Sequence, residues 1–139
     1  MALKFHPSPG AILICDYSTG FILPEMIKKR PVIVISPRPR RQRQLCTIVP
    51  LSTTKPDPIE SYHHQLNSLS LPDKLARKET WAKCDMLATV SLERLDRIKI
   101  GKDMNGKRIY INHSIISEDM DAIMKCVLTA LGLKGFKTA

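Results

Sequence analysis

Three short apolar runs near the N-terminus constrain the fold of this 139-residue chain most strongly. They are residues 11–16 (AILICD), 31–36 (PVIVIS) and 45–51 (LCTIVPL). Their aliphatic and β-branched side chains favour strands, and glycine, proline and serine residues punctuate the segments between them. Short strands with such tight punctuation predict a small barrel or sandwich rather than strands that alternate with helices.

The middle of the chain gives weaker signals. Residues 52–80 are polar, contain several prolines and are predicted to be mainly loop. Residues 81–90 (WAKCDMLATV) are predicted to form a fourth strand, and residues 91–98 (SLERLDRI) have a short helical pattern. The Asn105-Gly106 dipeptide predicts a turn before residues 107–112, which read as a further strand or extended segment.

The clearest helical pattern lies near the C-terminus. Ser117 is predicted to be the N-cap, acidic residues follow it in the first turn, and Gly132 suits the C-terminal cap. Apolar residues recur at helical spacing, namely Met120, Ile123, Met124, Val127, Leu128 and Leu131. The chain is therefore predicted to be one domain, residues 1–139, mainly β with a C-terminal amphipathic helix that covers the core or a subunit interface.

Positive charge is concentrated in the first part of the chain. The net charge is +9, and residues 28–43 (KKRPVIVISPRPRRQR) contain seven cationic side chains and no acidic one. Residues 1–56 hold nine Lys and Arg against two acids, whereas residues 57–139 hold thirteen against eleven. This asymmetry indicates an anionic partner, either nucleic acid or an anionic membrane surface. The alternative is charge that serves only solubility.

Other classes of protein are disfavoured. The N-terminus has no long apolar run and no window approaches the length of a membrane span, so we expect a cytoplasmic protein. The four cysteines, Cys15, Cys46, Cys84 and Cys126, are scattered and form no CxxC pair. We therefore expect buried, reduced thiols rather than a zinc site.

Polar residues at strand positions are the first candidates for chemistry. Trp81, Lys83 and Asp85 would share one face of the predicted fourth strand, because side chains alternate along a strand. Arg30 stands at the entrance to the second strand, where its guanidinium can fork onto a phosphate. The alternatives are a solvated Lys-Asp pair and an ion pair between Arg30 and Glu25.

Hydroxyls and histidines give further candidates. Ser52 and Thr53 end the third strand, and their hydroxyls could donate to a phosphate oxygen or form a local turn. His63 and His64 fall in the polar loop, where a general base and a simply solvated pair are both open. Nothing nearby completes a triad or a metal-binding set.

Three segments together resemble a known family. GAILICDYSTGFILPEMIKKRPVIVISP, CTIVPLST and KCDMLATVSLERL follow the order and spacing of the PemK/MazF toxins of type II toxin–antitoxin systems, over about residues 10–101. The resemblance implies a compact SH3-like β-barrel of the PemK/MazF/CcdB kind with a terminal helix, usually a homodimer. It also implies an endoribonuclease that cuts single-stranded RNA at short sequences without a metal or other cofactor, and a cognate antitoxin that blocks its RNA groove.

The resemblance also implies residue roles. Arg30 matches the family's catalytic arginine, and Thr53 matches the threonine after the third strand. Asp85 matches an acidic residue that some members use, and Lys83 stands where those members have arginine. Glu25 matches the loop glutamate. Two positions depart from the pattern: Pro24 replaces the histidine of some members, and Ala88 replaces an arginine before Thr89.

In such a site the RNA's own 2′-hydroxyl attacks the adjacent phosphorus and leaves a 2′,3′-cyclic phosphate and a 5′-hydroxyl. Asp85 would act as or orient the base, Arg30 would stabilise the phosphorane, and Thr53 and Lys83 would hold the non-bridging oxygens. The remaining expected RNA contacts are Lys28, Lys29, Arg38, Arg40, Arg41, Ser52 and Glu25, with Trp81 stacking on a base. Two alternatives stay open: a non-catalytic module of the same fold that binds nucleic acid or protein, and a purely structural dimer.

Overall fold

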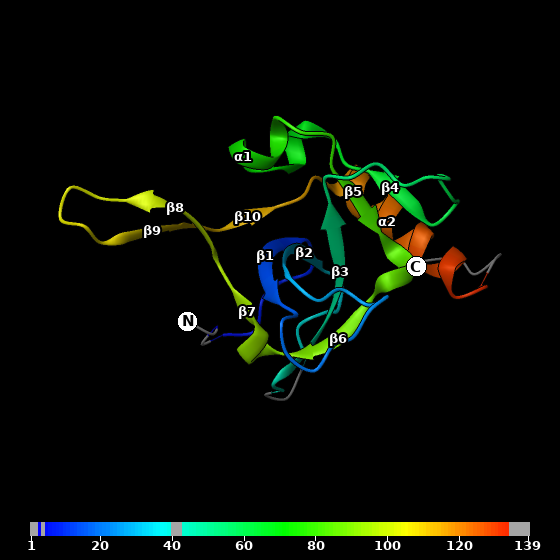
Figure 1. The fold of residues 1–139 in the computed structure, drawn as a ribbon, viewed down its shortest axis with the longest axis horizontal. Helices are drawn as coiled ribbons and strands as arrows, with labels where there is room; N and C mark the ends of the chain where they lie inside the picture. The colour runs from blue at the N-terminus through cyan, green and yellow to red at the C-terminus, as the bar shows by residue number, and fades with distance from the viewer. Residues whose placement is uncertain (1–2, 4, 40–42, 134–139) are drawn as a thin grey trace.

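A bent antiparallel sheet forms most of the structure (Figure 1). The computed structural model describes residues 3, 5–39 and 43–133, so Arg40 and Arg41 lie outside the described residues. The sheet has the strand order β10-β1-β2-β3-β5-β4. These strands are β1 (Ala11–Asp16), β2 (Lys29–Val34), β3 (Leu45–Ser52), β4 (His63–Gln65), β5 (Trp81–Lys83) and β10 (His113–Ser114). The three N-terminal runs are thus strands, and the first has the predicted bounds.

The two faces of this sheet bury two different apolar clusters. Because side chains alternate along β2, Ile33 points into one cluster, whereas Val32 and Val34 point into the other. The first cluster contains Val49 and Leu51, together with residues from the C-terminal helix. The second cluster contains Ile48 and residues of β1. Both faces are apolar here, which explains why the run 32–35 is continuously apolar rather than alternating.

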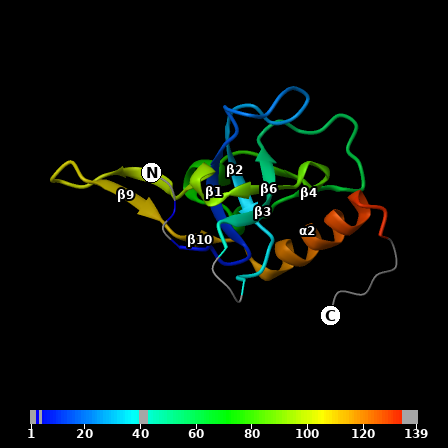
Figure 2. The ribbon, with the colours of Figure 1, turned by 90° about the horizontal axis from the view of Figure 1, so that it is seen from below.

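Helix α2 (Ser117–Ala130) covers the first cluster (Figure 2). Its side chains Ile123 and Val127 are buried there. The predicted cap at Ser117 is wrong: Ile116 occupies the N-cap position, Ser117 is the first helical residue, and no side chain caps the helix. The predicted C-terminal cap is confirmed. Gly132 has φ +74°, its N–H donates to Thr129 O at 3.0 Å, and Leu133 N–H donates to Leu128 O at 2.8 Å.

Short strands wrap the second cluster. β6 (Ala88–Ser91) pairs with β3, β7 (Leu95–Asp96) pairs with β1, and the 3-10 helix η3 (Leu92–Arg94) joins β6 to β7. Among the described residues the pairing does not close into a ring, because β6 and β7 are joined through η3 rather than by a ladder. The predicted mainly β fold with a terminal helix is confirmed, without a closed barrel.

Residues 81–98 differ from the expectation of one strand followed by a helix. β3 pairs with Ala82 through Leu51 and with Ala88 through Ile48. Two residues of β3 separate these pairs, whereas five separate Ala82 from Ala88, and the surplus forms the 3-10 helix η2 (Cys84–Met86). In place of the helix suggested by the spacing of residues 91–98, the chain forms η3 and β7, and both Leu92 and Leu95 are buried.

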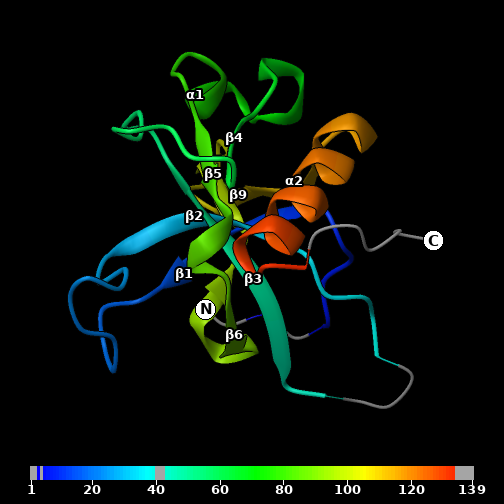
Figure 3. The same cartoon turned by 90° about the vertical axis from the view of Figure 1, so that its right-hand side faces the viewer.

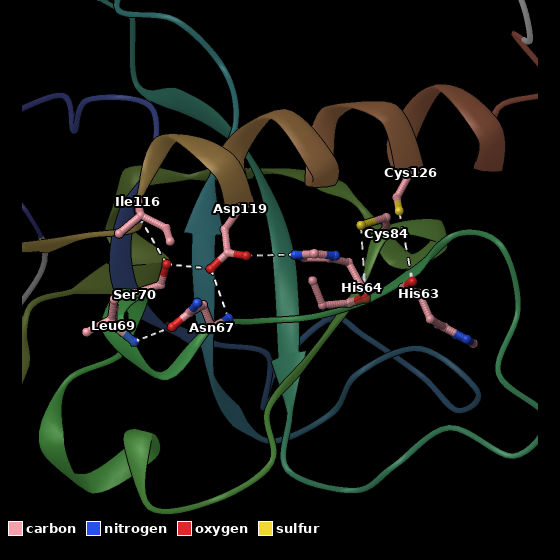
Figure 4. A network of polar contacts seen from close by, with 10 residues as sticks. His63, His64, Asn67, Leu69, Ser70, Cys84, Ile116, Asp119 and Cys126 are labelled. Carbon is pink, nitrogen blue, oxygen red and sulfur yellow. Dashed lines mark hydrogen bonds and ion pairs between the residues drawn. The ribbon is translucent and has the colours of Figure 1, made fainter.

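The segment predicted to be loop, residues 52–80, contains β4, the 3-10 helix η1 (Ser68–Ser70) and the short helix α1 (Asp73–Ala76). A buried carboxylate ties it to α2 (Figure 4). Asp119, 5% exposed, accepts hydrogen bonds from His64 Nε2 at 2.8 Å, Asn67 N at 3.0 Å and the Ser70 hydroxyl. His64 is therefore structural rather than solvated. The network fixes β4 at the edge of the sheet.

Strands β8 (Ile98–Lys102) and β9 (Arg108–Ile111) form a separate hairpin, which extends away from the main sheet (Figure 1). We call this hairpin the arm. Gly106, with φ +76°, lies in its turn, as the Asn105-Gly106 dipeptide predicts. The β1–β2 connection and α2 lie on opposite sides of the sheet (Figure 3).

Candidate functional site

Arg30 lies on the face of the sheet opposite α2. Arg30 pairs with Cys15 across β1 and β2. Val32 and Val34 lie two and four residues further along β2 and pack in the second cluster, so the Arg30 side chain is on the same face of the sheet. The side chain is half-buried, and its Nε is buried with no hydrogen-bond partner among the described residues. Buried donors are usually paired, so this unpaired guanidinium nitrogen makes Arg30 a candidate donor to a ligand.

Glu25 does not neutralise this arginine in the described part of the chain. Its Oε1 accepts a hydrogen bond from Ile22 N at 2.7 Å and closes a turn of the β1–β2 connection. The alternative of an ion pair between Arg30 and Glu25 therefore does not fit the structure.

Strand register brings Ser52 and Lys83 to the face of Arg30. Ile48 packs in the second cluster, and Ser52 lies four residues further along β3, so its side chain shares the face of Arg30. Ser52 pairs with Trp81, and Lys83 lies two residues further along β5, on the same face. Lys83 is half-buried. Two cations and a hydroxyl thus line one side of the sheet across β2, β3 and β5.

The hydroxyls at the end of β3 have separate surroundings. The Ser52 Oγ accepts a hydrogen bond from Thr54 N at 3.1 Å, which is the local turn expected as the alternative. Thr53 follows the strand, is exposed, and makes no side-chain hydrogen bond within the described residues. The Thr53 hydroxyl is therefore available to a ligand.

A groove of about 430 Å³ lies between the β1–β2 connection and η2. Glu25 and Asp85 both line it, so the structure brings together two residues separated by 60 positions in sequence. Its apolar wall includes Tyr17 and Phe21, whose rings meet edge to face with centroids 5.0 Å apart. These aromatic residues pack in or against the second cluster, which places the groove on the face of Arg30.

An arginine holds the groove's wall in place. Arg94 Nη1 donates to Asp16 O at 3.1 Å and Thr19 O at 2.8 Å, and its guanidinium lies 4.8 Å from the centre of the Phe21 ring. A cation over an aromatic face is attractive. The β1–β2 connection is therefore tied to η3.

The carboxylates of Asp85, in η2, and of Glu60 both lie near the Tyr62 phenol. Asp85 is exposed. Partial burial raises the pKa of the nearby Tyr62 phenol, and the negative charges of Asp85 and Glu60 raise it further. Tyr62, Asp85 and the paired residues His63 and Lys83 thus gather where β4, β5 and η2 meet.

Several expected RNA contacts have different positions. Trp81 is only 6% exposed, and its Nε1 donates to Glu79 Oε1 at 2.9 Å, so the expectation that it stacks on a base does not fit the structure. Lys28 and Arg38 are exposed. Lys29 is also exposed but alternates to the opposite face from Arg30, where it borders a separate cavity of about 260 Å³.

His63, which the sequence left open as a general base or a solvated side chain, lies beside the candidate site. It pairs with Lys83 across β4 and β5 and therefore shares the face of Lys83. Its Nδ1 accepts a hydrogen bond from Glu60 N at 3.0 Å, so a neutral ring carries its proton on Nε2. The place of His63 beside Lys83 follows from the pairing of β4 with β5. The sequence of β4 is short and has few apolar residues, so it does not reveal this pairing.

The thiols take no part in the site. All four cysteines are free, and Cys15, Cys46 and Cys84 are buried, as expected from the sequence. Burial raises the pKa of the Cys15 thiol to about 11, which disfavours the nucleophilic thiolate. In the described part of the chain, no group of three or more His, Cys, Asp or Glu side chains could hold a metal ion. No helix there is long and apolar enough to cross a membrane.

The family follows from comparison with known sequences. Residues 8–130 match the family model described as the PemK-like, MazF-like toxin of type II toxin–antitoxin systems. The chain therefore belongs to the PemK/MazF family, as its sequence segments indicated. Membership of a type II system implies an antitoxin partner.

Two curated relatives cover nearly the whole chain. YifN of Escherichia coli strain K12, an uncharacterised protein, is 30% identical over 91% of this chain and 95% of its own length. An uncharacterised protein of Haemophilus influenzae strain KW20 is 29% identical over 91% of this chain and 94% of its own.

Solved structures confirm the fold. An endoribonuclease from a mycobacterial species matches with a TM-score of 0.61 and 18% identity, over 92% of this chain and 93% of its own. MazF from Deinococcus radiodurans matches with a TM-score of 0.60 and 14% identity, over 93% of this chain and 99% of its own. The Mycobacterium tuberculosis toxin MazF-mt6 matches with a TM-score of 0.54 and 16% identity, over 89% and 98%.

Proposed function

We propose that this protein is the toxin of a toxin–antitoxin pair and a metal-independent endoribonuclease that cuts single-stranded RNA at preferred sequences. Family membership and the fold shared with MazF structures support this proposal. So does the name of the mycobacterial structure, an endoribonuclease. The proposal places the protein in the cytoplasm as a homodimer controlled by a cognate antitoxin.

The observation that carries the proposal is the environment of Arg30. A half-buried guanidinium with an unpaired Nε lies on a sheet face that also presents Ser52 and Lys83. Such donors are suited to a phosphate, because a guanidinium is planar, stays charged and can make two parallel hydrogen bonds. Held before substrate arrives, they would stabilise the extra charge on the phosphoryl oxygens without rearranging.

The chemistry needs one proton removed and another supplied. In our proposal Asp85, or a water that Asp85 orients, takes the proton of the ribose 2′-hydroxyl. The resulting oxygen forms a bond to the adjacent phosphorus, and the bond from phosphorus to the 5′ oxygen breaks. The products are a 2′,3′-cyclic phosphate and a 5′-hydroxyl, which receives a proton. Arg30 stabilises the phosphorane, while Thr53 and Lys83 hold non-bridging oxygens.

RNA reaches this face as an unpaired strand. Its bases can then be splayed away from the backbone, which duplex RNA does not permit. Lys28 and Arg38 would contact neighbouring phosphates, as would Arg40 and Arg41, whereas Lys29 faces away from this side of the sheet. Glu25 and Asp85 border the groove that we assign to the nucleotide next to the cleaved bond.

The test is cleavage of a long single-stranded RNA in excess EDTA, followed by mass analysis of the fragment ends. We expect discrete fragments with 2′,3′-cyclic phosphate and 5′-hydroxyl ends. A matched oligonucleotide with a 2′-methoxy group at the cleavage position should bind and stay intact, because it lacks the nucleophile. Cutting of that oligonucleotide at the same position would contradict the mechanism.

One observation favours a second candidate, a module that binds without cutting. No histidine of the described residues lines the groove, where Pro24 occupies the position of the histidine found in some relatives. The same assay separates the two functions. RNA that is retained by the protein but stays intact would favour the binding module.

A further inference from the structure

Two of the four cysteines meet between α2 and η2 (Figure 4). Cys84 is fully buried in the first cluster, and Cys126 packs against that cluster from α2. The two thiols lie within hydrogen-bonding reach of each other. Cys126 is also the one cysteine of the four that is not buried, so it is the cysteine most accessible to a dissolved oxidant.

The fold brings these thiols together from two segments far apart in sequence. Cys126 lies three residues after the buried Ile123, so both side chains lie on the side of α2 that faces the sheet. Its thiol donates to Ser61 O at 3.5 Å. Cys84 follows Lys83 at the end of β5 and packs on the side of α2, whereas Lys83 faces the opposite side of the sheet.

The surroundings of the two thiols give them different reactivity. Burial raises the pKa of both. The contact between them then lowers the pKa of Cys126 and raises that of Cys84, and the nearby Asp85 carboxylate raises the pKa of Cys84 further. The thiolate is the nucleophile in thiol oxidation. Cys126 is therefore the thiol that reacts first, and Cys84 is placed to react with its product.

We propose that Cys84 and Cys126 are a redox pair, which a peroxide converts to a disulfide that ties η2 to α2. The Cys126 thiolate attacks one oxygen of hydrogen peroxide, and the O–O bond breaks. Hydroxide leaves and takes up a proton, and Cys126 becomes a sulfenic acid. The Cys84 sulfur then attacks the Cys126 sulfur, the S–O bond breaks, and water leaves. Two thiols have been oxidised to one disulfide, and the peroxide has been reduced to two waters.

The bond acts on the candidate site through η2. A disulfide holds its sulfurs about 2.05 Å apart, closer than two thiols in hydrogen-bonding contact, so its formation pulls Cys84 toward α2. Lys83 precedes Cys84 and Asp85 follows it, and both act in RNA cleavage in the proposed function, on which this step rests. A displacement of about 1 Å at such a group can lower the rate about a hundredfold. Oxidation therefore slows cleavage, and reduction restores it.

The first experiment maps the bond in the full-length protein. The protein is treated with hydrogen peroxide, its remaining thiols are alkylated in denaturant, and its peptides are identified by mass spectrometry with and without dithiothreitol. We expect one bond within the chain, between Cys84 and Cys126, and a protein about 2 Da lighter before alkylation. Cys15 and Cys46 are the internal control: they are 0% and 1% exposed and should be recovered as alkylated thiols.

Two variants test the order of the steps. Cys126→Ser protein should form no disulfide. Cys84→Ser protein lacks the second thiol, so Cys126 should stop at the sulfenic acid, which dimedone traps. The wild-type map decides the proposal even if the buried Cys84→Ser variant fails to fold. A bond between two copies of the chain, a bond to Cys15 or Cys46, or oxidation of Cys126 to a sulfinic acid with no bond to Cys84 would overturn the proposal.

Cleavage measures the effect on the site. The oxidised protein should cut single-stranded RNA at least about tenfold more slowly than the reduced protein, and dithiothreitol should restore the rate. The control is Cys126→Ser protein, which should cut equally well before and after peroxide. Equal cleavage by wild-type protein with and without the bond would overturn the proposed control of the site and leave the proposed function standing. A protein that forms the bond but cuts RNA in neither state would refute the proposed function and leave the redox pair standing.

Discussion

His63 and His64 are neighbours in β4, yet the alternation of the strand gives them different surroundings. His64 Nε2 donates to the carboxylate of the buried Asp119 at 2.8 Å, on the side of α2. His63 pairs with Lys83 on the opposite side, where Arg30 also lies. One histidine therefore belongs to the framework and the other to the candidate site.

This difference predicts opposite effects of two matched substitutions. His64→Ala removes one partner of a buried carboxylate, so we expect the free energy of unfolding to fall by about 1.5–3 kcal/mol. His63→Ala should change it by less than about 0.5 kcal/mol, because its ring has no buried partner. Urea denaturation of both variants measures the effect. Equal destabilisation would show that the Asp119 network does not hold β4.

The sequence identified some site residues because their strands are simple. Arg30 precedes a continuous apolar run, so its position at a strand entrance could be predicted. Trp81, Lys83 and Asp85 were expected to share one face of a strand, and this prediction is wrong for Asp85, because β5 ends at Lys83 and Asp85 lies in η2. The surplus of residues opposite β3 that produces η2 depends on pairing between distant segments, which a linear pattern does not contain.

At the scale of elements, α2 was predictable and its start was not. The apolar spacing and the left-handed Gly132 are local signals, whereas the N-cap at Ile116 depends on tertiary contacts. Ile116 N donates to the Ser70 hydroxyl at 3.0 Å, and that hydroxyl also bonds Asp119. The Ser70 side chain of η1 thus accepts a hydrogen bond at the start of α2, where Ser117 was expected to provide the cap.

The C-terminal cap of α2 gives a second prediction. Gly132→Ala forces a side chain into a left-handed conformation and should lower the free energy of unfolding by about 1 kcal/mol. Gly132→Asn is the control, since asparagine tolerates this conformation and should cost less than alanine. Thermal unfolding followed by circular dichroism compares them. A Gly132→Ala protein as stable as wild type would contradict the assigned cap.

In the whole molecule, the excess of positive charge lies in two regions. The first basic segment surrounds β2 and the face of Arg30. The second region is the arm. The net charge of residues 57–139 does not reveal it, because acidic residues elsewhere in that part of the chain cancel the positive charge of the arm. A chain with net charge +9 will attract RNA from a distance, but only the cations that touch phosphates set the salt dependence of binding.

Two lysines on different sides of the molecule test this view. Lys28 precedes β2, and Lys125 is an exposed residue of α2, on the opposite side of the sheet. Lys28→Ala should weaken RNA binding and reduce the slope of log affinity against log salt by about 0.7, the value for one phosphate contact on a single strand. Lys125→Ala should leave the slope unchanged. Titrations at several salt concentrations measure both, and equal slopes for the two variants would contradict the assigned RNA face.

The central claim is that Arg30 stabilises the transition state of RNA cleavage. The most direct measurement is single-turnover cleavage of one single-stranded RNA in EDTA by wild-type, Arg30→Ala and Arg38→Ala proteins, each first shown to have the wild-type unfolding temperature. The account predicts a rate at least about a hundredfold lower for Arg30→Ala, as for the loss of one preorganised donor. Arg38→Ala should reduce mainly binding. Cleavage by Arg30→Ala at the wild-type rate would contradict the account.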